Sequence, residues 1–141
     1  MSKIKGISSE LTERLNWLVC LGDLFSSYEK NKNDQFYKTI KKAEIHNPWF
    51  SEQNINTSIN YWQNKLKLKN INAWISKYKI IKTPPIQVGI VMAGNFPFAG
   101  LHDLICVIIS GNIALVKPSK SDKILIDYLI DYIWNKFPKS K

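Results

Sequence analysis

Two short motifs contain the side chains of this sequence that are best suited to chemistry. The first, Ala93 to Pro97 (A-G-N-F-P), is a turn that carries one neutral side-chain amide, that of Asn95. The second ends in Lys117 to Lys120 (K-P-S-K), which carries two cations and a hydroxyl. The simpler alternatives are an asparagine favoured by turn geometry and a solvated lysine at the end of a strand.

The common phosphate-binding loops are not present. The sequence has no G-x-G-x-x-G, and the Walker-like spacing from Gly89 to Gly94 is followed by Asn95-Phe96 where Lys-Ser or Lys-Thr is required. Binding of a nucleotide therefore has to rest on the two motifs above.

His102, Asp103 and Cys106 form a third candidate cluster. A His-Asp pair is typical of acid–base chemistry, and a cysteine four residues after a histidine is reminiscent of an activated nucleophile. Adjacent helix positions direct their side chains apart, and a helix cysteine is usually buried, so we interpret the cluster as structural. Cys20 and Cys106 lack metal-ligand spacing, so neither a zinc site nor a disulfide framework is predicted.

The elements that position these motifs follow two patterns. Residues 1–82 have helical periodicity, with a helix over 34–44 and another that Ser51 caps, the latter interrupted near Asn70. Residues 83–141 predict strand 86–92, helix 99–109 ended by Gly111, strand 113–116 and helix 122–136, with Ser119 or Ser121 as the cap of the last helix.

The fold class predicted is α/β, with parallel strands joined by a helix. The uncharged run 86–92 is typical of a strand buried on both faces, and two strands make an incomplete sheet with an exposed edge, which predicts poor solubility.

The two motifs together resemble the aldehyde dehydrogenase superfamily. An N-[FY]-P turn follows the first Rossmann-like strand in that superfamily, and G-N-x-x-[LV]-x-K-P-[SA] follows one helix later, as it does here from Gly111. The turn from Met92, the G-x-H-D at 100–103 and the Asn47 to Phe50 segment are most similar to the LuxC-type acyl-CoA reductases. The resemblance covers nearly the whole chain.

This resemblance implies a helical N-terminal region (1–82) followed by the start of the Rossmann-like parallel sheet of the aldehyde dehydrogenase fold (83–141), left incomplete. Family members form a thioester between a cysteine and a fatty acyl group and reduce it to the aldehyde with a nicotinamide cofactor. The nucleophile of the family lies downstream of K-P-S, so we expect this chain to be an N-terminal fragment that lacks it.

The resemblance also assigns roles to individual residues. It makes Asn95 the oxyanion donor and gives cofactor contacts to Ala93, Gly94, Lys117, Ser119 and Lys120. Relatives that prefer NAD often carry Glu where Lys120 stands, and a cation there favours the 2′-phosphate of NADPH. The alternative function is a non-catalytic remnant or a nucleotide-binding module of the same family.

Composition sets the remaining expectations. The net charge of +9 favours partners that carry phosphate, and the implied substrate is a fatty acyl-CoA. Dispersed lysines and a single arginine, Arg14, argue against nucleic acid, and the apolar run from Leu104 to Val116 is too short to span a membrane. We expect a cytoplasmic protein whose full-length form is compatible with a homo-oligomer.

Overall fold

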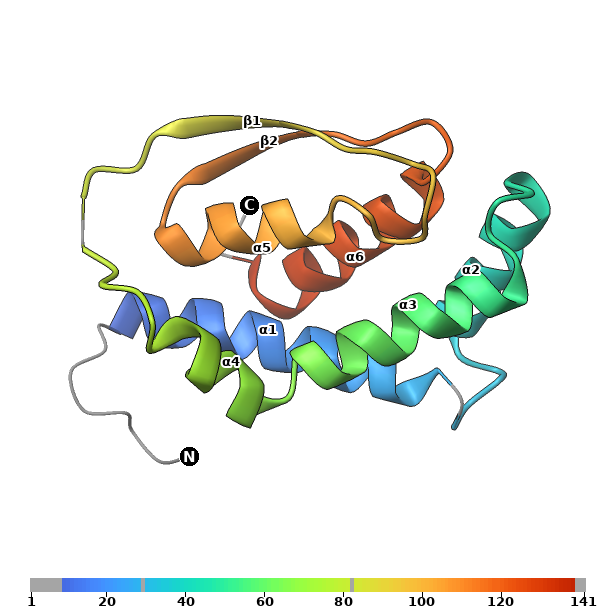
Figure 1. The fold of residues 1–141 in the computed structure, drawn as a ribbon, viewed down its shortest axis with the longest axis horizontal. Helices are drawn as coiled ribbons and strands as arrows, with labels where there is room; N and C mark the ends of the chain where they lie inside the picture. The colour runs from blue at the N-terminus through green and yellow to red at the C-terminus, as the bar shows by residue number, and fades with distance from the viewer. Residues whose placement is uncertain (1–8, 29, 82, 139–141) are drawn as a thin grey trace.

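The computed structural model describes residues 9–28, 30–81 and 83–138. Four helices come first, then a strand, a helix, a second strand and a closing helix (Figure 1). Their bounds are α1 Ser9–Ser27, α2 Gln35–His46, α3 Glu52–Lys65, α4 Leu68–Ile75, β1 Gln87–Val91, α5 Leu101–Ser110, β2 Ile113–Lys117 and α6 Lys123–Lys136. The fold is therefore mixed α/β and mostly helical, with the order of elements that the sequence predicts.

Each helix forms where the apolar side chains recur at helical spacing. The inward stripe of α3 consists of Ile55, Ile59 and Trp62, which are all buried. Ser51 caps this helix as predicted, because its hydroxyl accepts a hydrogen bond from the backbone N–H of Asn54 at 3.3 Å. Gly111 ends α5 with a φ of +87°, a conformation that a glycine adopts without strain.

The two strands form a parallel sheet with α5 as their connection. Val91 pairs with Lys117 at one end and Gln87 with Ile113 at the other, so both strands end at the same edge. The sheet forms an outer layer, α5 and α6 lie beneath it, and α1, α3 and α4 form the layer below them (Figure 1). Ile90 of β1 is buried against this interior.

The prediction that the first strand is buried on both faces is wrong. Val91 of β1 is 80% exposed, and Ile113 and Leu115 of β2 are 47% and 51% exposed. A parallel sheet needs a helix layer on each face, and among the described residues the helices pack on one face only (Figure 1). The apolar side chains of the other face are therefore open to solvent.

Two local predictions are also corrected. The interruption between the third and fourth helices falls at Leu66 and Lys67, and Asn70 lies inside α4, where its Nδ2 donates to the carbonyl of Asn64 at 2.7 Å. The N-cap residue of α6 is Asp122, and neither Ser119 nor Ser121 caps it, because the Ser119 hydroxyl accepts instead from the N–H of Ser121.

One hydrophobic core joins the helical region to the strand-helix-strand unit. α1 contacts α3, α5 and α6, and α2 contacts α6. At its centre the ring of Phe98 lies 5.1 Å from that of Phe25 and 6.4 Å from that of Phe36, between centroids, and all three side chains are fully buried. The turn that carries Phe98 is thus attached to helices far away in the sequence.

Gly22 is where α1 approaches the end of α3 most closely. A Cβ built there would lie 2.8 Å from the carbonyl oxygen of Leu66 and 3.0 Å from its Cβ. Alanine is a better helix former than glycine, but its Cβ would force the rigid backbone at Leu66 to move. We therefore expect Gly22→Ala to lower the free energy of unfolding by about 1–3 kcal/mol. Urea unfolding followed by circular dichroism measures this. The control is Gly89→Ala, where a Cβ meets nothing within 4 Å; equal stability of the two variants would contradict the predicted close packing.

Candidate functional site

The two sequence motifs meet at the carboxyl ends of β1 and β2. The N–H of Met92 donates to the carbonyl of Lys117 at 3.1 Å, so the chains leave the sheet side by side. A Cβ on Gly94 would lie 2.1 Å from the Oγ of Ser119, which means that only a glycine fits against this serine. Ligands of open α/β sheets bind outside the carboxyl ends of the strands, and the motifs lie at that position.

We call this group of residues the strand-end site. It comprises the predicted site residues of both motifs: Ala93, Gly94, Asn95, Lys117, Ser119 and Lys120. Asn95, Lys117 and Lys120 are exposed, while Ser119 is half-buried. Because side chains alternate along a strand, Lys117 lies on the open face of the sheet with Leu115. The direct contact that the structure provides between the two motifs is the one between Gly94 and Ser119.

Two buried side chains from the helical region fix the turn after β1. Asn47 donates from Nδ2 to the carbonyls of Ser121 at 3.2 Å and Gly94 at 3.5 Å, so it spans both motifs. Ser58 donates to the carbonyl of Pro97 at 2.7 Å. Sequence reasoning did not identify either residue as part of the site. The sequence gives only a weak signal for each of them. Asn47 is a polar residue beside Pro48, and Ser58 is a serine on the apolar stripe of a helix.

Asp122 fixes the same turn from the opposite direction. It is 1% exposed, and its Oδ2 accepts a hydrogen bond from the N–H of Phe98 at 2.9 Å. Phe98 has a φ of +60°, which is unusual for a bulky residue and costs on the order of 1–3 kcal/mol. The hydrogen bond to Asp122 and the packing of the Phe98 ring hold the turn in this conformation.

Burial raises the pKa of Asp122 to about 7, although hydrogen bonds from the amides of Phe98 and Ala99 act to lower it. Its Oδ1 is buried and has no hydrogen-bond partner among the described residues, which fits a carboxyl that is mostly protonated below about pH 7. The loops of the strand-end site contain no other acid, so Lys117 and Lys120 determine its charge.

The strand-end site has features that suit a phosphate group. Lys117 and Lys120 supply two exposed cations. The hydroxyl of Ser119 accepts from the N–H of Ser121 at 3.3 Å, which leaves its own proton to donate. The N-terminus of the fourteen-residue helix α6 begins just beyond and adds the positive end of a helix dipole. Cations, hydroxyl donors and a helix N-terminus are groups that bind an anion.

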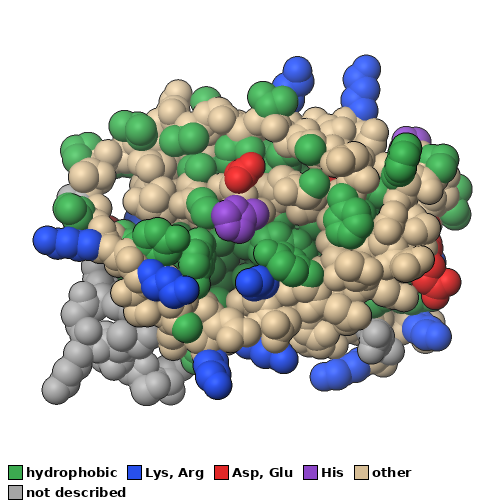
Figure 2. Space-filling view, viewed as in Figure 1, with side chains coloured by type: hydrophobic (Ala, Val, Ile, Leu, Met, Phe, Trp, Pro, Cys, Tyr) green, Lys and Arg blue, Asp and Glu red, His purple; other side chains and the backbone are tan. Residues whose placement is uncertain are grey.

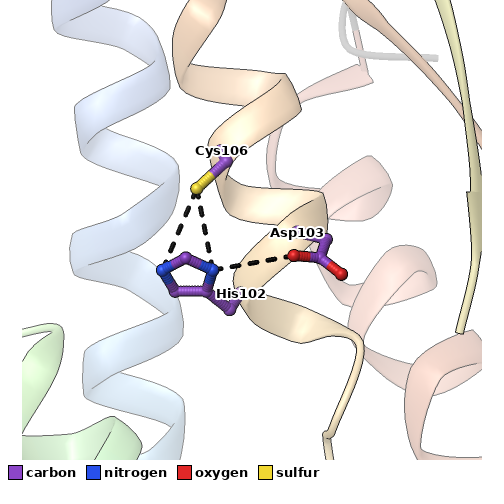
Figure 3. A network of polar contacts seen from close by, with 3 residues as sticks. All are labelled: His102, Asp103 and Cys106. Atoms are coloured by element: carbon purple, nitrogen blue, oxygen red, sulfur yellow. Dashed lines mark hydrogen bonds and ion pairs between the residues drawn. The ribbon is translucent and has the colours of Figure 1, made fainter. Parts of the chain in front are cut away.

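His102, Asp103 and Cys106 lie together on α5 (Figure 3). The Nδ1 of His102 is 3.7 Å from an oxygen of Asp103. This contact was not predicted from the sequence, because adjacent helix positions direct their side chains apart. The sulfur of Cys106 lies 3.8 Å from the Nδ1 and 4.0 Å from the Nε2 of His102. It therefore faces the edge of the ring between the two nitrogens and is not aligned with the lone pair of either. Cys106 is half-buried, where full burial was expected.

This geometry does not activate the thiol. Partial burial, with a smaller contribution from the charge of Asp103, raises the pKa of Cys106, and partial burial together with Asp23 raises that of Cys20. The thiolate is the reactive form, so both cysteines are poor nucleophiles at neutral pH. No group of three His, Cys, Asp or Glu side chains within the described ranges is arranged to hold a metal ion.

Comparison with protein families, with characterised proteins and with solved structures finds no match to this chain. None of the helices in the described part of the chain has the length and hydropathy that crossing a membrane requires. Assignment of a function therefore rests on the residues and their geometry.

Asp122 makes stability depend on pH. Its pKa is about 7 in the folded chain and near 3.8 when unfolded, so the folded state binds more protons between these values. The contribution of Asp122 to stability is then greatest at low pH, falls by a few kcal/mol as the pH rises from about 4 to about 7, and is constant above that. We expect Asp122→Asn to remove most of this fall, measured by urea unfolding at several pH values.

The matched control is Asp127→Asn on the same helix, where the carboxylate pairs with Lys123 at 2.6 Å and is 43% exposed. This variant should keep the pH dependence of the wild type. A fall of the same size in the Asp122→Asn protein would show that other groups cause it.

Proposed function

We propose that this chain is the N-terminal part of an acyl-CoA reductase, in which the strand-end site binds the adenosine and 2′-phosphate end of NADPH. The observation that supports the proposal is the contact between Gly94 and Ser119, which brings the A-G-N-F-P turn and the K-P-S-K loop together at the carboxyl ends of parallel strands.

Each residue of the site has a distinct task in this proposal. Lys117 contacts the ribose, and Lys120 with Ser119 holds the 2′-phosphate, the group that distinguishes NADPH from NADH. The amide of Asn95 donates to the oxygen of the acyl thioester as negative charge develops there. NADPH supplies the hydride that reduces this thioester to the aldehyde.

The buried contacts of the turn explain how Asn95 can perform its task. A donor contributes to catalysis when it is oriented before the charge develops, because it then needs no reorganisation. Asn47 holds the carbonyl of Gly94, the residue before Asn95, and Ser58 holds that of Pro97, two residues after it. The backbone around Asn95 is therefore fixed while its side chain faces solvent and is open to a substrate.

A nucleotide-binding module without catalysis is the second candidate function. The observation that favours it is the raised pKa of both cysteines, because the described residues then supply no thiolate of their own for a thioester. In the reductase proposal that thiolate belongs to a cysteine downstream of the K-P-S-K loop. Cofactor binding is common to the two functions, and reductase activity separates them.

Charge reversal at Lys120 tests the cofactor assignment. We expect the chain to bind adenosine 2′,5′-bisphosphate more tightly than 5′-AMP, and Lys120→Glu to weaken binding of the bisphosphate by about tenfold or more, because a carboxylate repels the 2′-phosphate. Isothermal titration calorimetry at fixed salt measures both ligands.

Lys79→Glu is the matched control, because Lys79 is exposed and precedes β1, at the opposite end of the sheet. It makes the same change in net charge. Equal weakening by both variants would indicate a general electrostatic effect and would contradict the assigned site.

The catalytic assignment is tested on the complete gene product with a fatty acyl-CoA and NADPH, following cofactor oxidation by absorbance. We expect Asn95→Ala to lower kcat by roughly 10²–10³, the usual effect of removing an oxyanion donor, with an unchanged affinity for adenosine 2′,5′-bisphosphate. Asn60→Ala, at an exposed position of α3, is the control. Cofactor binding without any aldehyde formation would favour the non-catalytic module.

A further inference from the structure

A cavity lies away from the strand ends, between α3, α4 and α5. It has a volume of about 400 Å³, which is within the range of sites for small organic ligands. Its lining includes three aromatic side chains and three basic ones: Tyr61, Trp62, Trp74, Lys65, Lys77 and His102. Figure 2 shows this face, where a hollow among hydrophobic side chains has a histidine at its edge and lysines nearby. We call it the α4 pocket.

Flat apolar surfaces form the walls of the α4 pocket. Trp62 is 6% exposed and meets Tyr61 edge to face, with 5.2 Å between the ring centroids. Trp74 lies on the opposite helix, 6.3 Å from the ring of His102 and inclined to it by 50°. Ile71 and Ile105 are among the aliphatic residues of the lining. Rings held at fixed angles favour a planar aromatic group over a flexible chain.

The charge of the pocket is positive. The ammonium of Lys65 lies 5.4 Å from the centroid of Tyr61, at the rim, and Lys77 is exposed just after α4. None of the lining residues is acidic. Asp103, whose carboxylate contacts the lining residue His102, is 71% exposed to solvent, which screens its charge. A ligand with an anionic group is therefore favoured over a neutral or cationic one.

From these features we infer that the α4 pocket binds a small aromatic carboxylate. The ring lies between Trp62 and Trp74, and the carboxylate faces Lys65 and Lys77. This inference does not depend on the strand-end site or on reductase activity, because the two sites share no residue.

Binding is tested with 2-naphthoate on the whole chain by following the indole N–H signals of the five tryptophans in ¹H–¹⁵N NMR spectra. We expect the signals of Trp62 and Trp74 to shift, with a dissociation constant on the order of 0.1–1 mM for a ligand of this size. Those of Trp49 and Trp134, which do not line the pocket, should stay in place. Equal shifts of all five signals, or none at millimolar ligand, would overturn the inference.

Three comparisons make the test specific for an aromatic anion. The neutral isostere 2-naphthamide should bind about tenfold more weakly, and octanoate should also bind more weakly than 2-naphthoate.

Lys65→Gln and Lys77→Gln should each weaken the binding of 2-naphthoate by roughly three- to fivefold. Lys69→Gln, on α4 but outside the lining, should leave this binding unchanged. These lysines are exposed, so we expect the variants to keep the fold. They therefore test the pocket even if a Trp74→Ala variant does not fold. Equal affinity for the amide or for octanoate contradicts the inference.

Discussion

The backbone turn that follows β1 is the constraint on which the strand-end site depends. Phe98 has a left-handed conformation that a phenylalanine does not adopt by itself, and Asp122 holds it through a buried hydrogen bond. Asn47 and Ser58 hold the carbonyls on either side of Asn95. The helical region and the start of α6 thus hold the backbone on both sides of Asn95.

The same burial that fixes the turn also sets the electrostatics around it. Burial of Asp122 raises its pKa to about 7, so this carboxyl carries about half of its negative charge at pH 7 and less below it. Lys117 and Lys120 remain exposed beside it. A cationic surface with few compensating carboxylates favours phosphate at this edge, whereas the overall charge of +9 is spread over many lysines and does not by itself specify a location.

The helix α5 connects the two candidate sites. It begins just after the turn of the strand-end site, and residues of its first two turns, His102 and Ile105, line the α4 pocket. Its other side contacts both strands. The sheet face that α5 does not cover exposes Val91 and Leu115, so the strands are more apolar than the described contacts require. That composition led to the incorrect prediction of burial on both faces.

The sequence by itself determined the order and type of the elements, because helical periodicity, the Ser51 cap and the Gly111 stop act over a few residues. It also determined that both motifs follow strands, and parallel pairing then requires them to meet at one edge. Tertiary structure alone decided which groups fix the motifs. Asn47 reaches Ser121 across 74 positions, and Ser58 reaches Pro97 across 39. No local pattern specifies such partners, because their hydrogen bonds exist only once the helices pack on the strand ends and exclude water.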